Sequence, residues 1–440
     1  MALTGHADGL PSLTPADAFG LLSRVTSELA MVTGNVGLSV RADPAELIAG
    51  RAALAGFTRQ GRVSAGGSAR LLRCADGWCA MTLSRADDAA AVPALLGLLG
   101  LNMPEQTGPA DAWAALAPAA LTRSASALAD GAQLLGVPAA ALPPRPAVAA
   151  AAAWPPWRVS RIAAASSASR LDGALVVDLS SMWAGPLCAR LLGLGGARVV
   201  KVETPDRPDG ARAGNREFFD WLHAGHESVL LDFRSASGRA ALGTMLASAD
   251  VVIEASRPRA LEQLGLAPSR VRHRDGQVWL SITGYGREKP DRVAFGDDAA
   301  VGGGLVGWVP GPGGARPEPV FCADAVADPL TGVTGALAVV RSLADGGGQL
   351  IDLSMRAVAA GFAAAPHAVH GHAVHGHTVH GHTVHDGSHS ACWERAGAIV
   401  RCDVLGQDQT VLPPARPAPA GRAHELGADT AAVLGRLGAE

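Results

Sequence analysis

Residues 174–203 read ALVVDLSSMWAGPLCARLLGLGGARVVKVE, and this stretch decides the fold. It opens on a continuous apolar run, ALVVDLS (174–180), passes through a helix-compatible segment and ends in a second run, ARVVKVE (197–203). Apolar runs without polar alternation are typical of strands buried on both faces of a parallel sheet. The stretch therefore predicts one strand–helix–strand unit.

The same alternation continues toward the C-terminus. Further apolar runs lie at 228–233, 250–255, 277–286 and 349–354, and helical segments are expected at 237–248 and 331–344. Strands that alternate with helices favour βαβ units joined into one parallel sheet. We therefore expect an α/β fold, a Rossmann-like doubly wound parallel sheet.

The chain before this segment has a different texture. Runs at 70–74 and 79–83 are strand-like, and Asp76-Gly77 between them is a hairpin turn signal. Residues 142–170 are rich in Pro, Ala and Ser. We expect an N-terminal domain over residues 1–145, a linker over 146–170 and the α/β domain over 171–366.

A His-rich tract follows at 367–390, where a VHGHA/VHGHT pentad repeat holds nine of the fourteen His. Imidazoles at this spacing could bind Ni²⁺, Zn²⁺ or Cu²⁺, or the tract could be a repeat expansion that forms a disordered loop. We favour the second interpretation and assign no metal site. Residues 391–440 form a C-terminal closing segment with a short helix at 428–437.

Composition narrows the class of protein. The formal net charge is −3 with no basic stripe, which argues against nucleic acid as a partner. No run reaches the roughly 18 apolar residues of a membrane helix, and MALTGHADGLP has no signal-peptide pattern. The six Cys are scattered, as expected of reduced thiols. We expect a cytoplasmic protein.

The Gly-rich loop at Gly193, Gly195 and Gly196 does not indicate a nicotinamide cofactor. It follows a helix and precedes a strand, whereas a dinucleotide fingerprint requires strand, loop and then helix. The sequence also lacks a Walker A motif, a G-x-S-x-G nucleophile turn and an H-E-x-x-H zinc motif.

Five motifs then occur in a fixed order between residues 171 and 356. They are VVDLSSMWAGPLCARLLGLGGARVVKVE (176–203), ESVLLDFRSASGR (227–239), ADVVIEASRPRALEQLGL (249–266), SITGYG (281–286) and ADPLTG (327–332). Together they resemble the family III CoA-transferases and the related alpha-methylacyl-CoA racemases. The resemblance implies a smaller α+β domain beside the sheet, a homodimer, and a CoA thioester as substrate with no further cofactor.

The resemblance also implies that Asp328, the acidic residue of ADPLTG, is the catalytic nucleophile. In the family this carboxylate attacks an acyl-CoA thioester, and aspartyl-anhydride and aspartyl-CoA intermediates follow. The residues alone leave an alternative, in which Asp328 caps the helix that follows. Backbone N–H groups at that helix start could also orient the carboxylate or bind an oxyanion. Asp324, four residues earlier, is interpreted as a loop residue.

CoA contacts in this family come from short backbone segments, and Arg234 and Arg257 are the candidates for the CoA phosphates, since guanidinium groups pair bidentately with phosphate. Tyr285 could stack on the adenine or close a loop. The full set of predicted CoA-binding residues is Trp183, Ala184, Leu231, Asp232, Phe233, Arg234, Ala255, Ser256, Arg257, Gly284, Tyr285 and Gly286.

The chain also departs from the family pattern. Members commonly carry a basic residue where this chain has Gln263, and N-x-G-K-R-S where it has HAGHES (223–228). Positive charges expected near the CoA phosphates are therefore missing, and other arginines must supply them or binding is weak. His223 and His226 are expected to be surface or packing residues. Where the racemases have G-H-D, this chain has Gly296-Asp297-Asp298, which favours transfer over racemisation.

Texture typical of the family's small domain lies before the catalytic segment, at 69–88 and 132–142, so residues 1–145 are interpreted as a degenerate partial family copy. The expected function is CoA transfer between an acyl-CoA thioester and a carboxylic acid. The alternatives are a 2-methylacyl-CoA racemase or isomerase and a non-catalytic acyl-CoA-binding protein.

Overall fold

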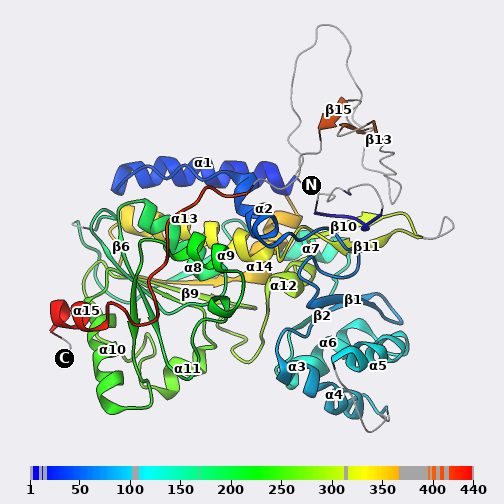
Figure 1. The fold of residues 1–440 in the computed structure, drawn as a ribbon, viewed down its shortest axis with the longest axis horizontal. Helices are drawn as coiled ribbons and strands as arrows, with labels where there is room; N and C mark the ends of the chain where they lie inside the picture. The colour runs from blue at the N-terminus through cyan, green and yellow to red at the C-terminus, as the bar shows by residue number, and fades with distance from the viewer. Residues whose placement is uncertain are drawn as a thin grey trace, which may run out of the picture.

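The structure is a computed structural model that describes residues 3–8, 12, 17–101, 109–167, 169–311, 316–365, 395–396, 399–402, 407–410 and 416–438. The predicted His-rich tract at 367–390 lies outside these residues. Figure 1 shows a large α/β body with a smaller domain beside it. None of the helices in the described ranges is long and apolar enough to cross a membrane.

A seven-stranded sheet forms the centre of the large body. Its order is β4-β12-β9-β8-β5-β6-β7, and every pair except β4 with β12 is parallel. Numbered along the chain from β5, the parallel strands have the order 3-2-1-4-5-6 of a doubly wound sheet, which confirms the predicted fold class. The strands are β4 (Trp157–Arg161), β5 (Leu175–Asp178), β6 (Arg198–Glu203), β7 (Glu227–Leu230), β8 (Val251–Glu254), β9 (Val278–Thr283) and β12 (Gln349–Ser354).

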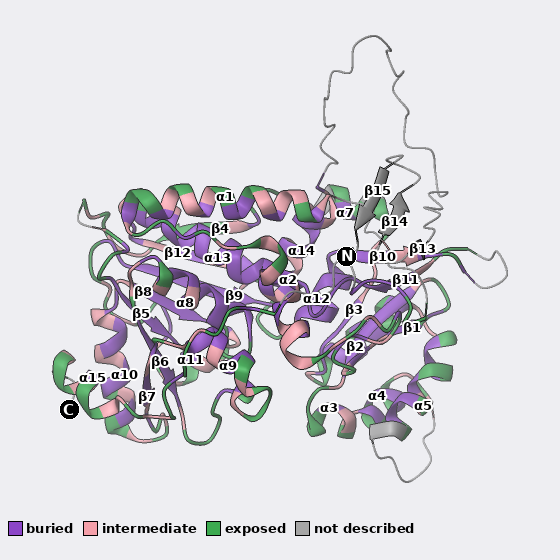
Figure 2. Ribbon diagram, turned by 45° about the horizontal axis from the view of Figure 1, so that its top comes forward, coloured by how far each residue is buried: buried purple, intermediate pink, exposed green. Residues whose placement is uncertain are grey.

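Successive side chains of a strand point to opposite faces of the sheet, so an apolar strand makes both faces apolar. Helices cover both of these faces. Val176 packs in the core beneath α8 and α13, and Val177 packs in the opposite core beneath α10. Figure 2 shows α13 and most of the length of the parallel strands as buried, whereas β4 is mostly exposed. The first face carries α8 (Ala184–Leu194), α13 (Ala327–Ala344) and α14 (Met355–Ala363), and the second carries α10 (Ala236–Ser248), α11 (Pro258–Gln263) and α15 (Thr430–Leu437).

The first two helices belong to the large body. Helix α1 (Ala18–Val36) lies along α13 (Figure 1), and α2 (Pro44–Ala55) contacts α13 and α9 (Arg216–His223). Their apolar side chains, among them Leu29 and Ile48, join the same core as α8 and α13. Residues 17–55 therefore belong to the large body and not to the N-terminal domain that the sequence predicts over 1–145.

The smaller domain has its own sheet and core. Strands β1 (Ala69–Arg73) and β2 (Trp78–Thr82) form the hairpin predicted from Asp76-Gly77, and β3 (Ala139–Ala141) pairs with β2. Helices pack on one face of this sheet, as an α+β domain requires. They are α3 (Ala86–Ala90), α4 (Val92–Leu98), α5 (Pro109–Leu121) and α6 (Ala125–Leu134).

Residues 146–170 are not the simple linker that their composition suggests. Most of α7 (Arg145–Ala151) lies in this segment, and β4 pairs antiparallel with β12. Pairing with β4 satisfies the backbone groups that β12 would otherwise expose at the sheet edge. Farther along the chain, the described C-terminal residues include a small antiparallel sheet of β13 (Arg395–Ala396), β14 (Ile399–Cys402) and β15 (Gln407–Thr410).

The smaller domain docks on the segment between β9 and α13. The second face of its sheet packs against Val301 of α12 (Gly296–Gly302) and Phe321 of β11 (Glu318–Phe321), which pairs with β10 (Val306–Val309). The Gln133 amide also exchanges two hydrogen bonds with the backbone of Val293, 2.8 and 2.9 Å long. The loop and helix after β9 are thus fixed by both domains.

Candidate active site

The residues predicted to contact CoA follow parallel strands at their carboxyl ends. Trp183-Ala184 follows β5, residues 231–234 follow β7, residues 255–257 follow β8 and residues 284–286 follow β9. These strands run in the same direction, so the loops gather at one edge of the sheet. The strand order reverses between β5 and β8, and doubly wound sheets bind ligands in the crevice at such a point.

A buried ion pair shapes the loop after β5. Nζ of Lys201 donates to the carbonyl oxygen of Ser180 at 2.9 Å and lies 2.8 Å from a carboxylate oxygen of Asp209. The Met182 N–H donates to Asp209 at 3.0 Å, and Met182 has a φ of 74°. Burial opposes the charge of Lys201, but neighbouring carboxylates outweigh burial and raise its pKa. The loop fixed in this way leads into Trp183, the buried residue before α8.

Asp328, the predicted nucleophile, lies in the first turn of α13 and does not cap it. The helix begins at Ala327, and Val326 holds the N-cap position. The Asp328 N–H donates to Ala325 O at 2.9 Å, and the Leu330 N–H donates to Val326 O at 3.3 Å. The expectation that these amides are free to bind an oxyanion is therefore wrong, because the helix starts earlier than its sequence pattern suggests.

The Asp328 carboxylate faces the start of α12. The Gly296 N–H donates to it, and the approach is so close that a methyl group on Gly296 would overlap carboxylate oxygen Oδ2. Burial raises the pKa of Asp328 to about 7, against the lowering effect of Arg51 and with further raising by Asp297 and Asp324. The group therefore ionises near neutral pH, as catalytic carboxyl groups often do.

Arg51 supplies positive charge to this site and was missed by the sequence analysis. It comes from α2, and its Nη1 lies 3.5 Å from Oδ1 of Asp324. Its guanidinium also lies 5.3 to 5.8 Å from the ring centroids of Phe57, Trp183 and Phe218, in cation–π contacts that fix its position. No motif marks Arg51, because it reaches the site only once α2 has packed against α13.

Asp324 is a buried member of this site and not only the loop residue expected. It is 1% exposed, and burial raises its pKa despite Arg51. The alanines on either side, Ala323 and Ala325, have φ values of 56° and 41°, a left-handed conformation that costs about 1–2 kcal/mol per residue. The Ala325 N–H donates to Oδ1 of Asp297 at 3.1 Å. This strained turn ties α12 to the start of α13.

The two acidic residues at the start of α12 face different surroundings. Asp298 accepts from the Phe295 N–H at 3.0 Å and from Oγ1 of Thr82 at 2.9 Å, so it connects α12 to the smaller domain. Burial raises its pKa to about 8. Burial and then Asp324 raise the pKa of Asp297 to about 7. Asp297 and Asp328 are thus two interacting carboxyl groups that ionise near pH 7.

The predicted CoA-binding side chains have varied surroundings. Arg234 is exposed and pairs with Asp206 at 2.8 Å. Arg257, before α11, is half-buried, and burial together with neighbouring arginines lowers its pKa. The Tyr285 hydroxyl donates to Ala139 O at 3.0 Å, which closes the loop onto the smaller domain. Of the others, Trp183, Ala184, Leu231, Gly284 and Gly286 are buried, Phe233 and Ser256 half-buried, and Asp232 and Ala255 exposed.

His223 and His226 are packing residues. Both are buried and their rings lie 5.5 Å apart in an edge-on arrangement. Burial lowers the pKa of His226 to about 3 and that of His223 well below its usual range. Both are therefore neutral near pH 7 and add no charge for a phosphate. Within the described ranges, no cluster of His, Cys, Asp and Glu is arranged to hold a metal ion.

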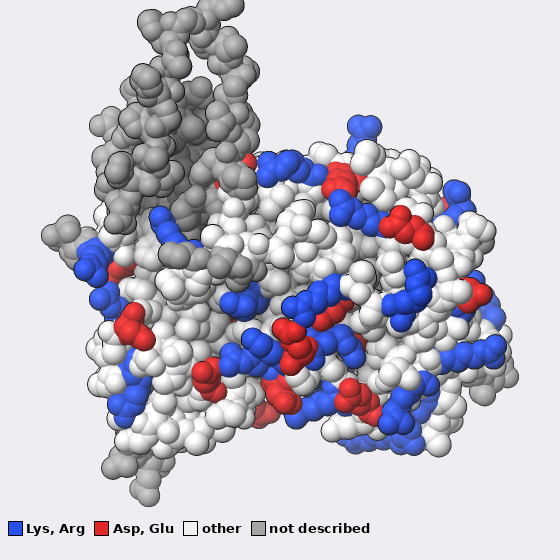
Figure 3. Space-filling model, turned by 180° about the vertical axis from the view of Figure 1, so that it is seen from behind, with Lys and Arg blue, Asp and Glu red and all other residues white. Residues whose placement is uncertain are grey.

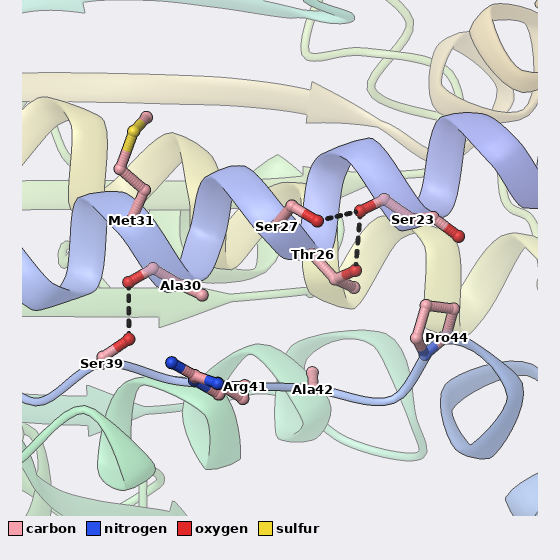
Figure 4. A pocket seen from close by; sticks show the side chains of 9 residues that line it. All are labelled: Ser23, Thr26, Ser27, Ala30, Met31, Ser39, Arg41, Ala42 and Pro44. Carbon is pink, nitrogen blue, oxygen red and sulfur yellow. Dashed lines mark hydrogen bonds between the residues drawn. The ribbon is translucent and has the colours of Figure 1, made fainter.

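A separate open groove lies between α1 and the segment before α2 (Figure 4). Its hydroxyl groups bond to helix carbonyls, as Ser39 does to Ala30 O at 2.8 Å. None of the site residues described above lines it.

On the face shown in Figure 3, basic and acidic side chains lie interspersed.

The family model described as CoA-transferase family III matches residues 171–400. An acyl-CoA transferase of Fusarium pseudograminearum is 31% identical over 44% of this chain and 46% of its own length. A succinate–glutarate CoA-transferase of Agrobacterium fabrum is 30% identical over 42% of this chain and 50% of its own. The chain thus spans about half the length of the curated relatives it matches.

Solved structures give matches of similar extent. A hypothetical protein of Mycobacterium tuberculosis is 30% identical, with a TM-score of 0.40 over 44% of this chain and 56% of its own. A CAIB/BAIF family protein of Brucella suis is 26% identical, with a TM-score of 0.38 over 45% of this chain and 55% of its own.

Proposed function

Because the chain belongs to CoA-transferase family III, we propose that it is an enzyme that moves CoA between an acyl-CoA thioester and a carboxylic acid, with Asp328 as nucleophile. Relatives named succinate–glutarate CoA-transferase and succinyl-CoA–L-malate CoA-transferase beta subunit support the reaction class. The chain matches about half of each relative, so the reaction is proposed for this protein and its acyl group is left open.

The observation that carries the proposal is the placement of Asp328. Its carboxylate lies in the first turn of α13, where the charge of Arg51 acts on it, receives the Gly296 N–H and ionises near pH 7. A carboxylate whose pKa is close to the working pH is available as a nucleophile and still leaves well from an anhydride or thioester.

The reaction proceeds in four acyl-transfer steps. The Asp328 carboxylate attacks the thioester carbonyl, and the C–S bond breaks to give a mixed anhydride and CoA thiolate. The thiolate attacks the aspartyl carbonyl, which releases the donor acid and leaves aspartyl-CoA. The acceptor carboxylate attacks aspartyl-CoA and again forms an anhydride and free thiolate. The thiolate finally attacks the acceptor acyl carbonyl, which yields the new acyl-CoA and regenerates Asp328.

Arg51 is placed to assist these steps. Each addition places negative charge on a carbonyl oxygen, and a fixed guanidinium in a partly desolvated site stabilises such charge. Asp324 pairs with Arg51 and, together with three aromatic rings, keeps the guanidinium in place.

Chemical trapping tests the proposal. The protein is incubated with succinyl-CoA as the probe, then treated with hydroxylamine or borohydride, and its peptides are analysed by mass spectrometry. We expect a modification at Asp328 that is absent in Asp328→Asn and present in Asp172→Asn, a variant of a carboxylate outside this site. If no adduct forms at Asp328 and Asp328→Asn keeps full transfer activity, the transferase assignment is wrong.

One observation favours a second function. Asp297 and Asp328 are two interacting carboxyl groups with pKa values of about 7, so one can hold a proton while the other accepts one. Such a pair could exchange the proton next to the thioester of a 2-methylacyl-CoA. Deuterium uptake from heavy water without an acceptor acid, lost in Asp297→Asn, would establish the racemase and set the transferase aside.

We also propose that the protein acts as a homodimer, as its family resemblance implies. Light scattering on a size-exclusion column tests this: a mass near twice 44.5 kDa is expected, and a single-chain mass at micromolar concentration would contradict it.

A further inference from the structure

The outer edge of β4 is open. β4 is the end strand of the seven-stranded sheet, and β12 pairs with its inner edge. Among the residues that the structure describes, no strand pairs with the other edge. Trp157 is half-buried and the remaining residues of β4 are exposed, so neither face of this strand is fully covered. An edge of this kind is a template for a further strand.

The hydrogen bonds of β12 show which backbone groups of β4 point outward. The Ile162 N–H donates to Gly348 O at 2.9 Å, and these two residues lie one step beyond the opposed pair of Arg161 and Gln349. The Gln349 N–H donates at 3.1 Å to Gln277 O, on the side away from β4. Hydrogen-bonded and non-bonded pairs alternate along antiparallel strands. The residues whose N–H and C=O groups point to the open edge are therefore Trp157, Val159 and Arg161.

We propose that β4 pairs antiparallel with β4 of a second copy of this chain, about a twofold axis at Val159. The inference rests on the homodimer of the proposed function and assigns the surface that forms it. Val159 then lies opposite the partner subunit's Val159, and Trp157 lies opposite the partner subunit's Arg161. Three such pairs exchange about six backbone hydrogen bonds, and the two sheets continue into one. A twofold contact of this kind uses the same surface on both copies.

The neighbouring registers are less favourable. A shift by two residues in one direction places Arg161 opposite Pro155 of the second copy, which has no N–H to donate. A shift in the other direction places Trp157 opposite Ala163, whose N–H already donates to Gly348 O at 3.2 Å. The register centred on Val159 is therefore the one in which every outward group of β4 finds a partner.

The side chains on the open edge complement one another in this register. Directly opposed residues have Cβ atoms about 4.5–5.5 Å apart, so each Arg161 reaches the partner's Trp157. Arg161 is exposed and has no carboxylate partner among the described residues. The Trp157 ring already lies 5.6 Å from the guanidinium of Arg341, whose charge is paired with Glu28. A second guanidinium on this ring adds a cation–π contact without meeting a net positive charge.

The remaining charge on β4 does not oppose the pairing. Arg158 lies opposite the partner subunit's Ser160, so no two like charges face each other across the edge. Its guanidinium is also 2.6 Å from a carboxylate oxygen of Glu288 in the same chain. Val159, which lies on the axis, is uncharged and 55% exposed, and pairing would bury two copies of this side chain against each other.

Cross-linking through a single cysteine tests the position of the axis. Val159→Cys places two thiols opposite each other in the proposed dimer, and a short bismaleimide should join them into a product of twice the chain mass on a denaturing gel. The matched control is Ala240→Cys, at an exposed position of α10 on the second face of the sheet, which should give no such product. Wild type measures the background from the six native cysteines.

A pair of proline variants tests which edge of β4 makes the contact. Val159→Pro removes an N–H that points outward, so the pairing of β4 with β12 is retained while the dimer loses hydrogen bonds at its axis. Ser160→Pro removes an N–H that points to β12 and should lower the melting temperature, which Val159→Pro should not. Sedimentation velocity gives the mass of each variant, and thermal unfolding shows whether it is folded.

Charge variants give the strength of the contact. Val159→Asp sets two carboxylates against each other at the axis and should raise the dimer Kd about a hundredfold or more. Its half-exposed position lets the single chain fold as before. Arg161→Ala loses the cation–π contact twice and should raise Kd about tenfold, and Arg161→Lys should raise it less.

The outcomes separate this surface from the proposed function. A dimer that Val159→Asp leaves intact, or one that Val159→Cys does not cross-link, overturns the β4 surface and leaves the homodimer standing. A single-chain mass for wild type at micromolar concentration overturns both. Dissociation by Val159→Asp together with the specific cross-link supports the surface whether or not transfer is detected, because trapping at Asp328 tests the reaction separately.

Discussion

The Gly296 N–H donates to the Asp328 carboxylate, and the two residues are too close for any side chain at position 296. The contact joins the start of α12 to the first turn of α13. It places one hydrogen-bond donor on the proposed nucleophile without adding another titrating group. The geometry of the nucleophile therefore depends on a residue that carries no side chain.

Gly296→Ala should lower kcat by about a hundredfold or more, since a small displacement of a reacting group is that costly. The methyl group would displace Asp328 from its donor. Steady-state transfer rates and circular dichroism measure the two consequences. The control is Gly97→Ala, a helical glycine whose new methyl group would meet nothing within 4 Å. Equal activity in both variants would show that the contact is dispensable.

The pH dependence of kcat/KM should respond to the two neighbours of Asp328 in opposite directions. Transfer needs the ionised carboxylate, so the rate should rise with pH through about 7. Arg51 lowers the pKa of Asp328 and Asp297 raises it. Arg51→Gln should therefore move the profile to higher pH, and Asp297→Asn should move it to lower pH. Shifts of the same sign would contradict this assignment.

Stability should fall as pH rises, because of Asp298. Its pKa is about 8 in the folded protein against 3.8 ordinarily, so between these values the folded protein keeps a proton that the unfolded chain releases. One such proton gives a loss of about 1.4 kcal/mol per pH unit. Asp298→Asn keeps an acceptor for Thr82 and should make the slope less steep by about this amount, while Asp297 and Asp328, with pKa values of about 7, keep their own contributions. Urea unfolding between pH 5 and 8 measures both slopes, and identical slopes would refute the expectation.

Lys201→Met should destabilise the protein by about 3–5 kcal/mol, because it leaves Asp209 as a buried charge without its partner. It should also release the loop that holds Met182 and Trp183, so activity should fall more than stability alone explains. Thermal unfolding and kcat measure these effects. Lys289 is the only other lysine and is exposed, so Lys289→Met is the matched control and should change neither.

The sheet was predictable from sequence, whereas the completed site was not. Runs such as 174–180 and 197–203 are apolar throughout because both sheet faces are covered, and that pattern is local. The choice of Asp328 as the candidate nucleophile rests on the ADPLTG motif, which is also local. Arg51 and the burial of Asp324 could not be predicted, because both depend on how α2 packs against α13.

Composition was a poor guide where pairing decided the structure. Residues 157–161 lie in a Pro- and Ala-rich stretch, yet they form β4 because the edge of β12 provides backbone partners. The helix of Asp328 also begins earlier than expected, at Ala327. In a sequence, an Asp followed by Pro looks the same whether the Asp caps a helix or lies in its first turn. Only the backbone hydrogen bonds distinguish these two positions.

The core beneath α8 and α13 is assembled from chain segments on both sides of residue 171. A protein truncated to the stretch matched by the family model would lack α1, α2 and β4, and would expose apolar surface on α13 together with an unpaired edge of β12. Such a fragment is expected to aggregate on expression. Attempts to produce the half matched by the family model should therefore retain residues 17–55 and 145–170, either in one chain or supplied as a second, co-expressed polypeptide.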